Sequence, residues 1–157
     1  MTDTTATTST ATAETGHGAA ETIRYTADVA AVDPDGRVLL IERGHPPFQG
    51  LLALPGGHVD AGETGLAAAV RELYEETGVQ VAPADLAFIG VYDEPDRDPR
   101  GRYVGVAYLA RVPAHTEARA GDDAATVQWV PLDSPPEQLA FDHARILADA
   151  RRIISGH

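Results

Sequence analysis

The stretch 57-GHVDAGETGLAAAVRELYEETGV-79 ends in a dense group of charged side chains, in which Arg71 is followed by Glu72, Glu75 and Glu76. In a helix, residues three or four positions apart lie on one face, so the pattern predicts a helix on which the three carboxylates converge. The opposite face carries larger side chains, which are Leu66, Val70, Leu73 and Tyr74. We therefore expect one face to pack against a core and the other to present a triple negative charge.

This concentration of negative charge needs a physical reason. Like charges four residues apart destabilise a helix by about 0.2–0.5 kcal/mol per pair, whereas oxygen-rich anionic clusters suit hard divalent cations such as Mg²⁺. A solvated acidic surface is the alternative interpretation. The preceding sequence favours a metal site. The apolar run 51–54 predicts a strand, and Gly56 and Gly57 predict a tight turn after it. Thr64 is a candidate N-cap for the helix.

The spacing of these residues resembles the Nudix box, G-x5-E-x7-R-E-U-x-E-E-x-G-U, in which U is an aliphatic residue. The chain matches every specified position, with Gly57, Glu63, Arg71, Glu72, Leu73, Glu75, Glu76, Gly78 and Val79. Because most of these positions demand a single residue type of ordinary abundance, a chance match is on the order of one in a million. The resemblance implies an α/β/α sandwich around a mixed β-sheet. It also implies Mg²⁺- or Mn²⁺-dependent hydrolysis of a nucleoside diphosphate linked to another group.

The resemblance further implies roles for individual residues. Glu72 and Glu76, one helical turn apart, are the candidates for direct metal ligands. Glu75 is a candidate to bind metal, hold water or deprotonate it. The backbone carbonyl of Gly57 matches an additional oxygen ligand of the family. We expect Arg71 to act in catalysis by orienting Glu75 through a charge-assisted hydrogen bond.

Other acidic residues each have two interpretations. Glu63 is expected to fix the loop against the helix, although an ordinary structural ion pair between Arg71 and Glu63 fits the sequence equally well. Some family members place the general base in a later loop, which makes Asp122, Asp123 and Glu94 candidates for that role. Solvated turn residues are the alternative for each of these three acids.

The composition fits a single globular domain. The 157 residues are 43% hydrophobic and 23% charged, which is ordinary for a domain with its own core. No cysteine is present, which excludes disulfides, thiolate zinc sites and cysteine nucleophiles. The formal net charge of −12 argues against a nucleic-acid-binding surface. An acidic protein that acts on a phosphate substrate needs bound cations, which the glutamates would hold.

The chain divides into two regions. Residues 1–21 are rich in Thr and Ala with few large apolar side chains, which predicts a disordered tail. The tail lacks the basic and apolar segments of a secretory signal and is not a membrane span, so we expect a cytoplasmic protein without membrane contact. Residues 22–157 are expected to form the Nudix domain. A homodimer is compatible with the sequence, which leaves the oligomeric state open.

Hydrophobic patterning predicts the remaining elements. The expected strands are residues 23–32, 37–42, 51–54, 86–92, 102–111 and 127–132. The turn at 33–36 contains Pro34 and Gly36, so the first two strands are expected to form a hairpin. A second helix is expected over 143–154, where apolar residues recur at helical spacing and Asp142 is a candidate N-cap.

Sequence outside the box indicates a substrate. Arg97, Arg100 and Arg102 lie together in an otherwise acidic chain, and arginine makes bidentate contacts with phosphate. The segments 46–50, 97–102 and 139–144 resemble the ADP-ribose pyrophosphatase branch of the family, which splits ADP-ribose into AMP and ribose 5-phosphate. Phe48 is a candidate for stacking on adenine. A charged, exposed hairpin is the alternative interpretation of the arginines.

Two other functions stay open. The same chemistry on a nucleoside triphosphate or on another nucleotide sugar fits the box equally well. A non-catalytic sensor of an ADP-ribose-type ligand belongs to a different class, and the complete glutamate set argues against it. Leu52 departs from the branch pattern, because relatives often carry Trp there.

Overall fold

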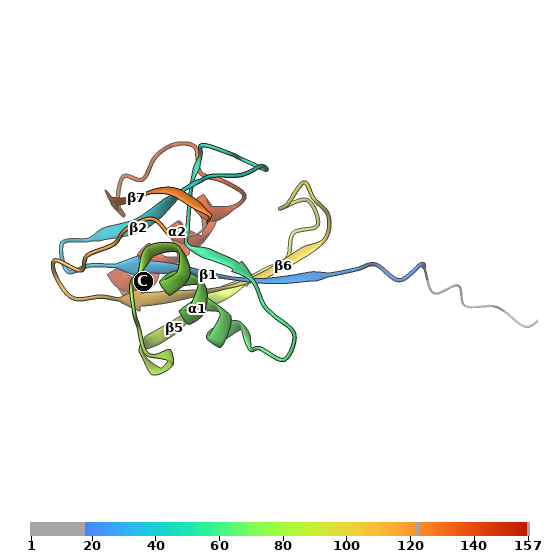
Figure 1. The fold of residues 1–157 in the computed structure, drawn as a ribbon, viewed down its shortest axis with the longest axis horizontal. Coiled ribbons are helices and arrows are strands. Elements are labelled where there is room, and N and C mark those ends of the chain that lie inside the picture. Colours follow the sequence, from blue (N-terminus) through green and yellow to red (C-terminus); the bar gives the residue numbers. More distant parts are fainter. Residues whose placement is uncertain (1–17, 122, 157) are drawn as a thin grey trace, which may run out of the picture.

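Strand β1 (Arg24–Val32) lies at the centre of a mixed β-sheet and contacts both helices that flank it (Figure 1). The computed structural model describes residues 18–121 and 123–156. The other strands in this part of the chain are β2 (Arg37–Arg43), β3 (Leu52–Ala53), β4 (Gly56–His58), β5 (Leu86–Tyr92), β6 (Tyr103–Arg111) and β7 (Ala124–Pro131). The helices are α1 (Gly65–Thr77), the short 3₁₀ helix η1 (Pro83–Asp85) and α2 (His143–Ser155).

The sheet combines parallel and antiparallel pairing. Its order is β3-β2-β1-β6-β5, with β4 also paired to β1 and β7 also paired to β2. β1 and β6 run parallel, in register from Arg24 opposite Tyr103 to Val32 opposite Arg111. The other pairs are antiparallel. The central strand therefore pairs with β2, which is close in sequence, and with β6, whose paired residues lie 79 positions later (Arg24 opposite Tyr103).

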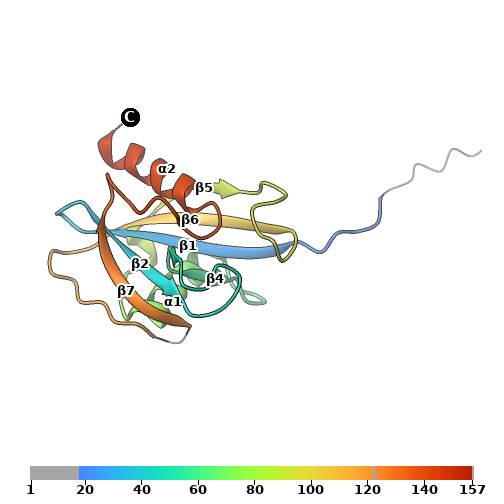
Figure 2. The same ribbon diagram turned by 90° about the horizontal axis from the view of Figure 1, so that it is seen from above.

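Alternating side chains of β1 serve the two sides of the sheet, as the two-residue period of a strand requires. Ala27 and Val29 pack with α1 in one core cluster, and Ala30 and Val32 pack with α2 in another. Figure 2 shows α2 on one side of the sheet and α1 on the other. The expected α/β/α sandwich is confirmed, and Asp28 falls on the same side of the strand as Ala30.

Helix α1 begins and ends at residues with clear local causes. The Thr64 hydroxyl accepts a hydrogen bond from the backbone N–H of Ala67 at 3.1 Å, which confirms Thr64 as the N-cap. At the other end, Gly78 adopts a left-handed conformation with φ of 72°, and its N–H donates to the carbonyl of Tyr74.

Three details differ from the expectations. The core face of α1 is made of Ala68, Ala69 and Leu73, and the small alanine side chains let the helix lie close to β1. Tyr74 does not belong to this face and is 52% exposed. Gly56 and Gly57 form strand β4 against β1 instead of a simple turn. Asp142 precedes α2, but its side chain makes no capping hydrogen bond.

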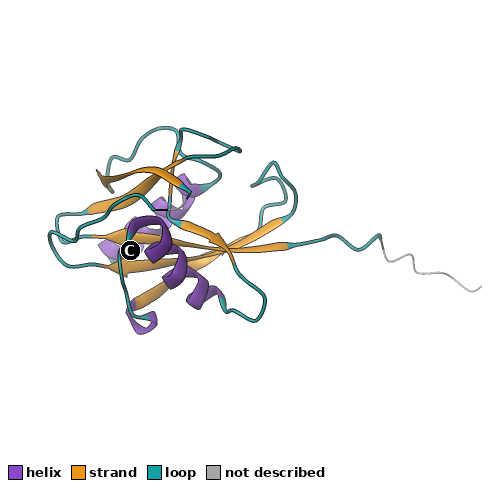
Figure 3. Ribbon diagram, in the orientation of Figure 1, coloured by secondary structure: helices purple, strands orange, loops and turns teal. Residues whose placement is uncertain are grey.

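The polar segments lie at the ends of the sheet. The loop between β5 and β6 projects beyond the strands (Figure 3). The expected disordered tail falls largely on residues 1–17, which lie outside the described residues. Across the part of the chain that is described, no helix has both the length and the apolar character needed to cross a membrane.

Candidate active site

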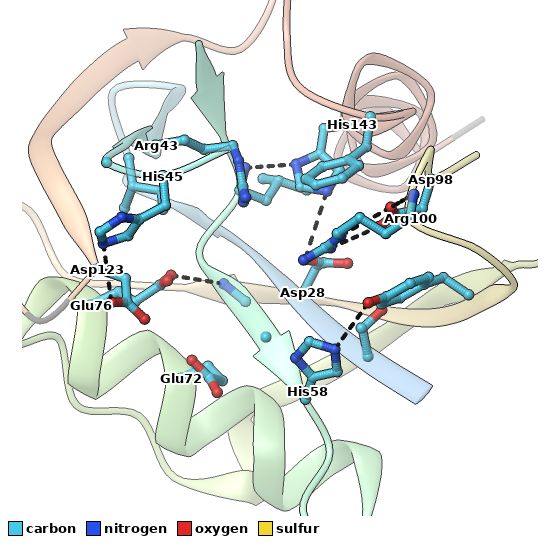
Figure 4. Close-up of a pocket in the computed structure, with 18 of the residues that line it drawn as sticks. Asp28, Arg43, His45, His58, Glu72, Glu76, Asp98, Arg100, Asp123 and His143 are labelled. Atoms are coloured by element: carbon cyan, nitrogen blue, oxygen red, sulfur yellow. Dashed lines mark hydrogen bonds and ion pairs between the residues drawn. The ribbon is translucent and has the colours of Figure 1, made fainter. Parts of the chain in front are cut away.

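A cavity of about 450 Å³ opens where β1, β4, α1 and the start of α2 meet (Figure 4). Its wall includes residues from the box, from the β5–β6 loop and from the segment before α2. The charged and aromatic members are Asp28, Arg43, His45, His58, Asp60, Glu72, Glu76, Arg97, Asp98, Arg100, Tyr103, Asp123, Phe141 and His143. The volume lies in the range of small-molecule sites.

Two of the three helix glutamates line this cavity. Glu72 and Glu76, four residues apart on α1, both belong to its wall. Glu76 is only 7% exposed, whereas the side chain of Glu75 is 40% exposed and is not among the lining residues. The three carboxylates therefore do not share one environment, because β4 covers the part of α1 that carries Glu72 and Glu76, and the alternative of a solvated acidic surface does not describe these two residues.

Glu76 is held in place by the main chain of β4. The backbone N–H of Gly56 donates to its Oε2 at 3.0 Å. Burial raises the pKa of Glu76 to about 8, and the negative charges of Glu72 and Asp28 act in the same direction. Burial also raises the pKa of Glu72. Glu72 and Glu76 therefore ionise less readily than free carboxyl groups, and a bound divalent cation would favour their ionised forms.

Glu72 lies against the backbone of Gly57. A Cβ at Gly57 would lie 2.5 Å from Oε1 of Glu72, so only glycine permits this approach. Glu72 thus lies against the main chain at Gly57 and Glu76 against that at Gly56, and carboxylate and carbonyl oxygens are the ligands that Mg²⁺ and Mn²⁺ prefer. Within the described residues, no three His, Cys, Asp or Glu side chains form a ready-made ligand set. The donors present fit a divalent cation whose remaining positions are filled by water or substrate.

Arg71 connects the glutamates to the loop that precedes them. Its Nε and Nη2 donate to the two carboxylate oxygens of Glu63 at 2.8 and 2.9 Å. Its Nη1 donates to Glu72 at 2.8 Å and to Glu75 at 3.0 Å, and Nη2 also donates to the carbonyl of His58. The hydrogen bonds to Arg71 lower the pKa of Glu63 to about 2. The Arg71–Glu75 hydrogen bond is the one expected from the sequence.

Asp28 and His143 are buried members of the site that sequence analysis did not assign. Nδ1 of His143 accepts a hydrogen bond from the backbone N–H of Leu54 at 2.9 Å, and Nε2 lies 3.7 Å from Oδ1 of Asp28. Burial raises the pKa of Asp28 to about 7 and lowers the pKa of His143 to about 3. A carboxylate within the apolar run of β1 is the signal that marks Asp28.

The three arginines of the β5–β6 loop occupy different environments. Arg97 is buried and makes two hydrogen bonds to Asp142, at 2.9 and 2.7 Å. Arg100 lines the cavity, pairs with Asp98 at 2.8 Å and lies over the ring of Tyr103. Arg102 is not among the lining residues and donates to the backbone carbonyl of Asp93. The cavity therefore brings together Arg97 and Arg100 but not Arg102.

Phe141 and Tyr103 line the cavity wall, whereas Phe48 does not. Phe48 packs edge-on against Phe141, with ring centroids 4.9 Å apart, and is absent from the lining residues. The guanidinium groups of Arg43 and Arg100 lie 4.8 and 5.6 Å from the centre of the Phe141 ring. Arg43, which sequence analysis did not assign, thus adds a second arginine near this ring.

The candidate general bases are separated by the fold. Asp123 lines the cavity, and its Oδ1 lies 3.6 Å from Nε2 of His45. Glu94 is not among the lining residues and pairs with Arg145 at 3.5 Å. Asp122 lies outside the described residues. Of the two candidate loop bases that are described, Asp123 lines the cavity and Glu94 does not.

Comparison with known proteins places this arrangement in a family. The NUDIX domain model matches residues 22–150, which covers both helices up to Ala150 and every cavity residue. The chain belongs to the Nudix family. It is a Nudix hydrolase, and the expected resemblance is confirmed over most of its length.

Relatives of this Nudix hydrolase include proteins whose names refer to ADP-ribose. The chain is 43% identical over 125 residues to an ADP-ribose pyrophosphatase of Methanocaldococcus jannaschii, covering 80% of this chain and 72% of that one. It also resembles the NUDIX domain of Shewanella oneidensis NrtR complexed with ADP ribose, with a TM-score of 0.75, 28% identity and coverage of 90% and 95%.

A third relative was crystallised with a nucleotide and a metal ion. It is a bifunctional NMN adenylyltransferase/ADP ribose pyrophosphatase of Francisella tularensis complexed with AMP and Mn ion, with a TM-score of 0.75 and 27% identity. The match covers 89% of this chain and 44% of that one. The fold of this chain therefore corresponds to one part of that larger protein.

Proposed function

We propose that this Nudix hydrolase cleaves ADP-ribose with water to give AMP and ribose 5-phosphate. The observation that carries the proposal is that the paired carboxylates Glu72 and Glu76 line the same cavity as Arg43 and Arg100. A diphosphate needs its negative charge offset and a water positioned for in-line attack. The similarity to the M. jannaschii ADP-ribose pyrophosphatase supports the choice of substrate.

The proposed metal site uses oxygen ligands from two elements. Glu72 and Glu76 of α1 and the backbone carbonyl of Gly57 in β4 are the residues that would hold Mg²⁺ or Mn²⁺. When bound, a divalent cation offsets charge on phosphoryl oxygens and makes water a better nucleophile. Arg71 keeps the carboxylates of Glu72 and Glu75 in place through its hydrogen bonds.

The proposed substrate contacts come from the opposite wall of the cavity. Arg100 presents a planar guanidinium that can donate two hydrogen bonds to phosphate oxygens, and Arg43 lies beside it on Phe141. Asp123 and Glu75 are the candidates to accept a proton from the attacking water. Asp123 has the better position, because it lines the cavity.

The test is a substrate panel with the purified full-length chain and Mg²⁺. ADP-ribose, NADH, other nucleotide sugars and nucleoside triphosphates are offered in parallel, and the products are separated by chromatography. We expect AMP and ribose 5-phosphate to form fastest. Preferential loss of triphosphates would instead assign the same chemistry to another substrate. Tight binding of ADP-ribose without turnover would identify a ligand sensor.

A pair of variants identifies the proton acceptor within the same panel. Asp123→Asn and Glu75→Gln each remove one carboxylate and keep the side-chain shape. We expect Asp123→Asn to lower kcat more than Glu75→Gln at neutral pH, with both variants still binding Mn²⁺. The reverse order would assign the proton transfer to Glu75.

A further inference from the structure

The segment 54–57, which joins β3 to β4, is held from three directions. From the α2 side, Nδ1 of His143 accepts from the N–H of Leu54 at 2.9 Å. From the α1 side, Glu76 accepts from the N–H of Gly56 at 3.0 Å. From β1, the N–H of Val29 donates to the carbonyl of Pro55 at 2.9 Å. The proposed ligand Gly57 is the last residue of this segment, so its position depends on these contacts.

The hydrogen bond from Leu54 fixes the proton on the His143 ring. A nitrogen that accepts a main-chain N–H carries no proton, so Nδ1 is bare and the neutral ring is protonated at Nε2. Nε2 lies 3.7 Å from Oδ1 of Asp28, and both side chains are buried. Burial in turn lowers the pKa of His143 to about 3, which agrees with a neutral ring.

Asp28 contacts the same segment at Gly56. A Cβ at Gly56 would lie 2.2 Å from Oδ1 of Asp28, so the carboxyl group packs directly against the Gly56 backbone. His143 therefore reaches the segment twice, through the Leu54 amide and through Asp28. An apolar residue at position 143 would leave the buried Leu54 N–H without its acceptor.

We propose that His143 is a positioning residue, which sets the place of segment 54–57, and hence of Gly57, relative to the glutamates of α1. The proposal rests on the proposed function, because it takes Gly57 and Glu76 as parts of a divalent-cation site. It assigns a role to α2 in a site whose family signature ends at Val79. The described side-chain contacts of His143 are with Leu54, Asp28 and Phe141, so it acts on the proposed ligands through other residues.

Three substitutions separate the two polar contacts of the ring, whose centroid also lies 5.3 Å from that of Phe141. His143→Asn places an amide oxygen near the position of Nδ1 and can still accept from Leu54. His143→Gln places its amide group near the position of Nε2 and can still donate toward Asp28. His143→Ala removes both contacts. Ile146→Val is the matched control, because Ile146 is fully buried one turn later on α2 and belongs to the apolar core.

The readouts are independent of whether ADP-ribose is the substrate. Mn²⁺ affinity is measured by electron paramagnetic resonance of the free ion, and the wild-type ring proton is located by long-range ¹H–¹⁵N spectroscopy. We expect an Nε2–H tautomer at neutral pH. For His143→Ala we expect Mn²⁺ binding about tenfold weaker and kcat about 10–100-fold lower, with KM nearly unchanged. We expect His143→Asn to recover most of the Mn²⁺ affinity.

Several outcomes would overturn the proposal. An imidazolium or an Nδ1–H tautomer in the wild type excludes the Leu54 contact, and this result does not require any variant to fold. A folded His143→Ala with wild-type Mn²⁺ affinity shows that the ring has no effect on the site. An equal loss of Mn²⁺ affinity in Ile146→Val shows a general effect of core stability. If the wild type binds Mn²⁺ but does not hydrolyse ADP-ribose, only the proposed substrate fails.

Discussion

Arg71 and Glu63 form a two-pronged ion pair, in which Nε and Nη2 of the guanidinium contact the two carboxylate oxygens at 2.8 and 2.9 Å. This leaves Nη1 to contact Glu72 and Glu75. The planar fork thus sets the direction of the remaining donor, which a flexible ammonium group would not do. The sequence left open whether Arg71 orients Glu75 or forms an ordinary structural ion pair with Glu63. The geometry combines the two interpretations, because the guanidinium that pairs with Glu63 also donates to Glu72 and Glu75.

The first prediction concerns this fork. Arg71→Lys keeps the positive charge but lacks the paired donors, so we expect kcat for ADP-ribose to fall about 10–100-fold with KM little changed. Arg151→Lys is the control, since Arg151 is an exposed residue of α2 whose contact is the carbonyl of Asp133. Steady-state kinetics measures both. Full activity of Arg71→Lys would show that charge alone is required.

The second prediction separates stability from activity at Glu76. Glu76→Gln keeps an oxygen that can accept from Gly56 but removes an ionisable group that is costly to bury. We expect kcat to fall by roughly a thousandfold or more, while the metal-free protein unfolds at the same or a higher temperature. Glu137→Gln, at an exposed position, is the control. A large loss of stability without metal would mean that the charged form of Glu76 supports the fold.

The third prediction concerns the pH dependence of stability without metal. The folded pKa values of Glu76 and Asp28, about 8 and about 7, lie above their ordinary values of 4.5 and 3.8. Between pH 6.5 and 8 the folded state therefore holds protons that the unfolded state has released, so the free energy of unfolding falls as pH rises. His143 opposes this trend only weakly above pH 6.5, because its folded pKa is lowered to about 3 and the unfolded ring, with an ordinary pKa of 6.5, loses its remaining proton in this range.

Chemical unfolding at several pH values, with a chelator and then with Mg²⁺, measures this trend. Each proton contributes at most about 1.4 kcal/mol per pH unit. Mg²⁺ is expected to reduce the slope, because the cation binds Glu76 in its ionised form and so removes the proton that the folded state would otherwise hold there. Glu76→Gln should flatten the metal-free curve. A free energy that rises from pH 6.5 to 8 without metal would contradict the assignment.

The fourth prediction contrasts two neighbouring glycines. A Cβ at position 56 would lie 2.4 Å from the carbonyl oxygen of Ala27, which is fixed in β1, so Gly56→Ala should destabilise the protein by roughly 1–3 kcal/mol. A Cβ at position 57 meets the mobile end of Glu72 instead. Gly57→Ala should therefore lose activity and Mn²⁺ affinity with a smaller loss of stability. Equal stability losses would mean that Glu72 cannot move aside.

The fifth prediction concerns the buried pair of Arg97 and Asp142. Arg97 has a side chain that is 5% exposed, so Asp142→Ala leaves a buried guanidinium without its carboxylate and should cost roughly 3–5 kcal/mol in urea unfolding. Asp142→Asn, which keeps one acceptor, should cost less. Glu94→Ala breaks the exposed pair with Arg145 and is expected to cost at most about 1 kcal/mol. If the two alanine substitutions lowered the free energy of unfolding by similar amounts, burial would not determine the strength of these ion pairs.

The elements of the fold were largely predictable, because strand and helix periodicity is local. The strand at 86–92 and the start of α2 at His143 agree with the structure. The exposure of Tyr74 and the covering of Glu76 by β4 were not predictable, because they depend on which neighbour packs on α1. The box indicated the chemistry, but its residue pattern does not show that β4 packs over the glutamates of α1.

The same distinction applies to the cavity. Glu72 and Glu76 were found because the motif fixes their spacing, and Arg100 because it is a cation in an acidic chain. Arg43 and His143 were not assigned, because each is an isolated polar residue whose role comes from a partner far along the sequence. His143, for example, receives its hydrogen bond from a residue 89 positions away.

The contribution of α2 to the cavity wall has a consequence for biosynthesis. Translation completes the box at Val79, whereas His143 emerges from the ribosome 64 residues later. The parallel pairing of β1 with β6 also waits for residues up to Arg111, and such distant pairings form slowly. A nascent chain therefore carries a complete family signature well before it has a closed site. A polypeptide released before α2 is made would contain the complete Nudix box but would lack the part of the cavity wall that His143 forms beside Asp28.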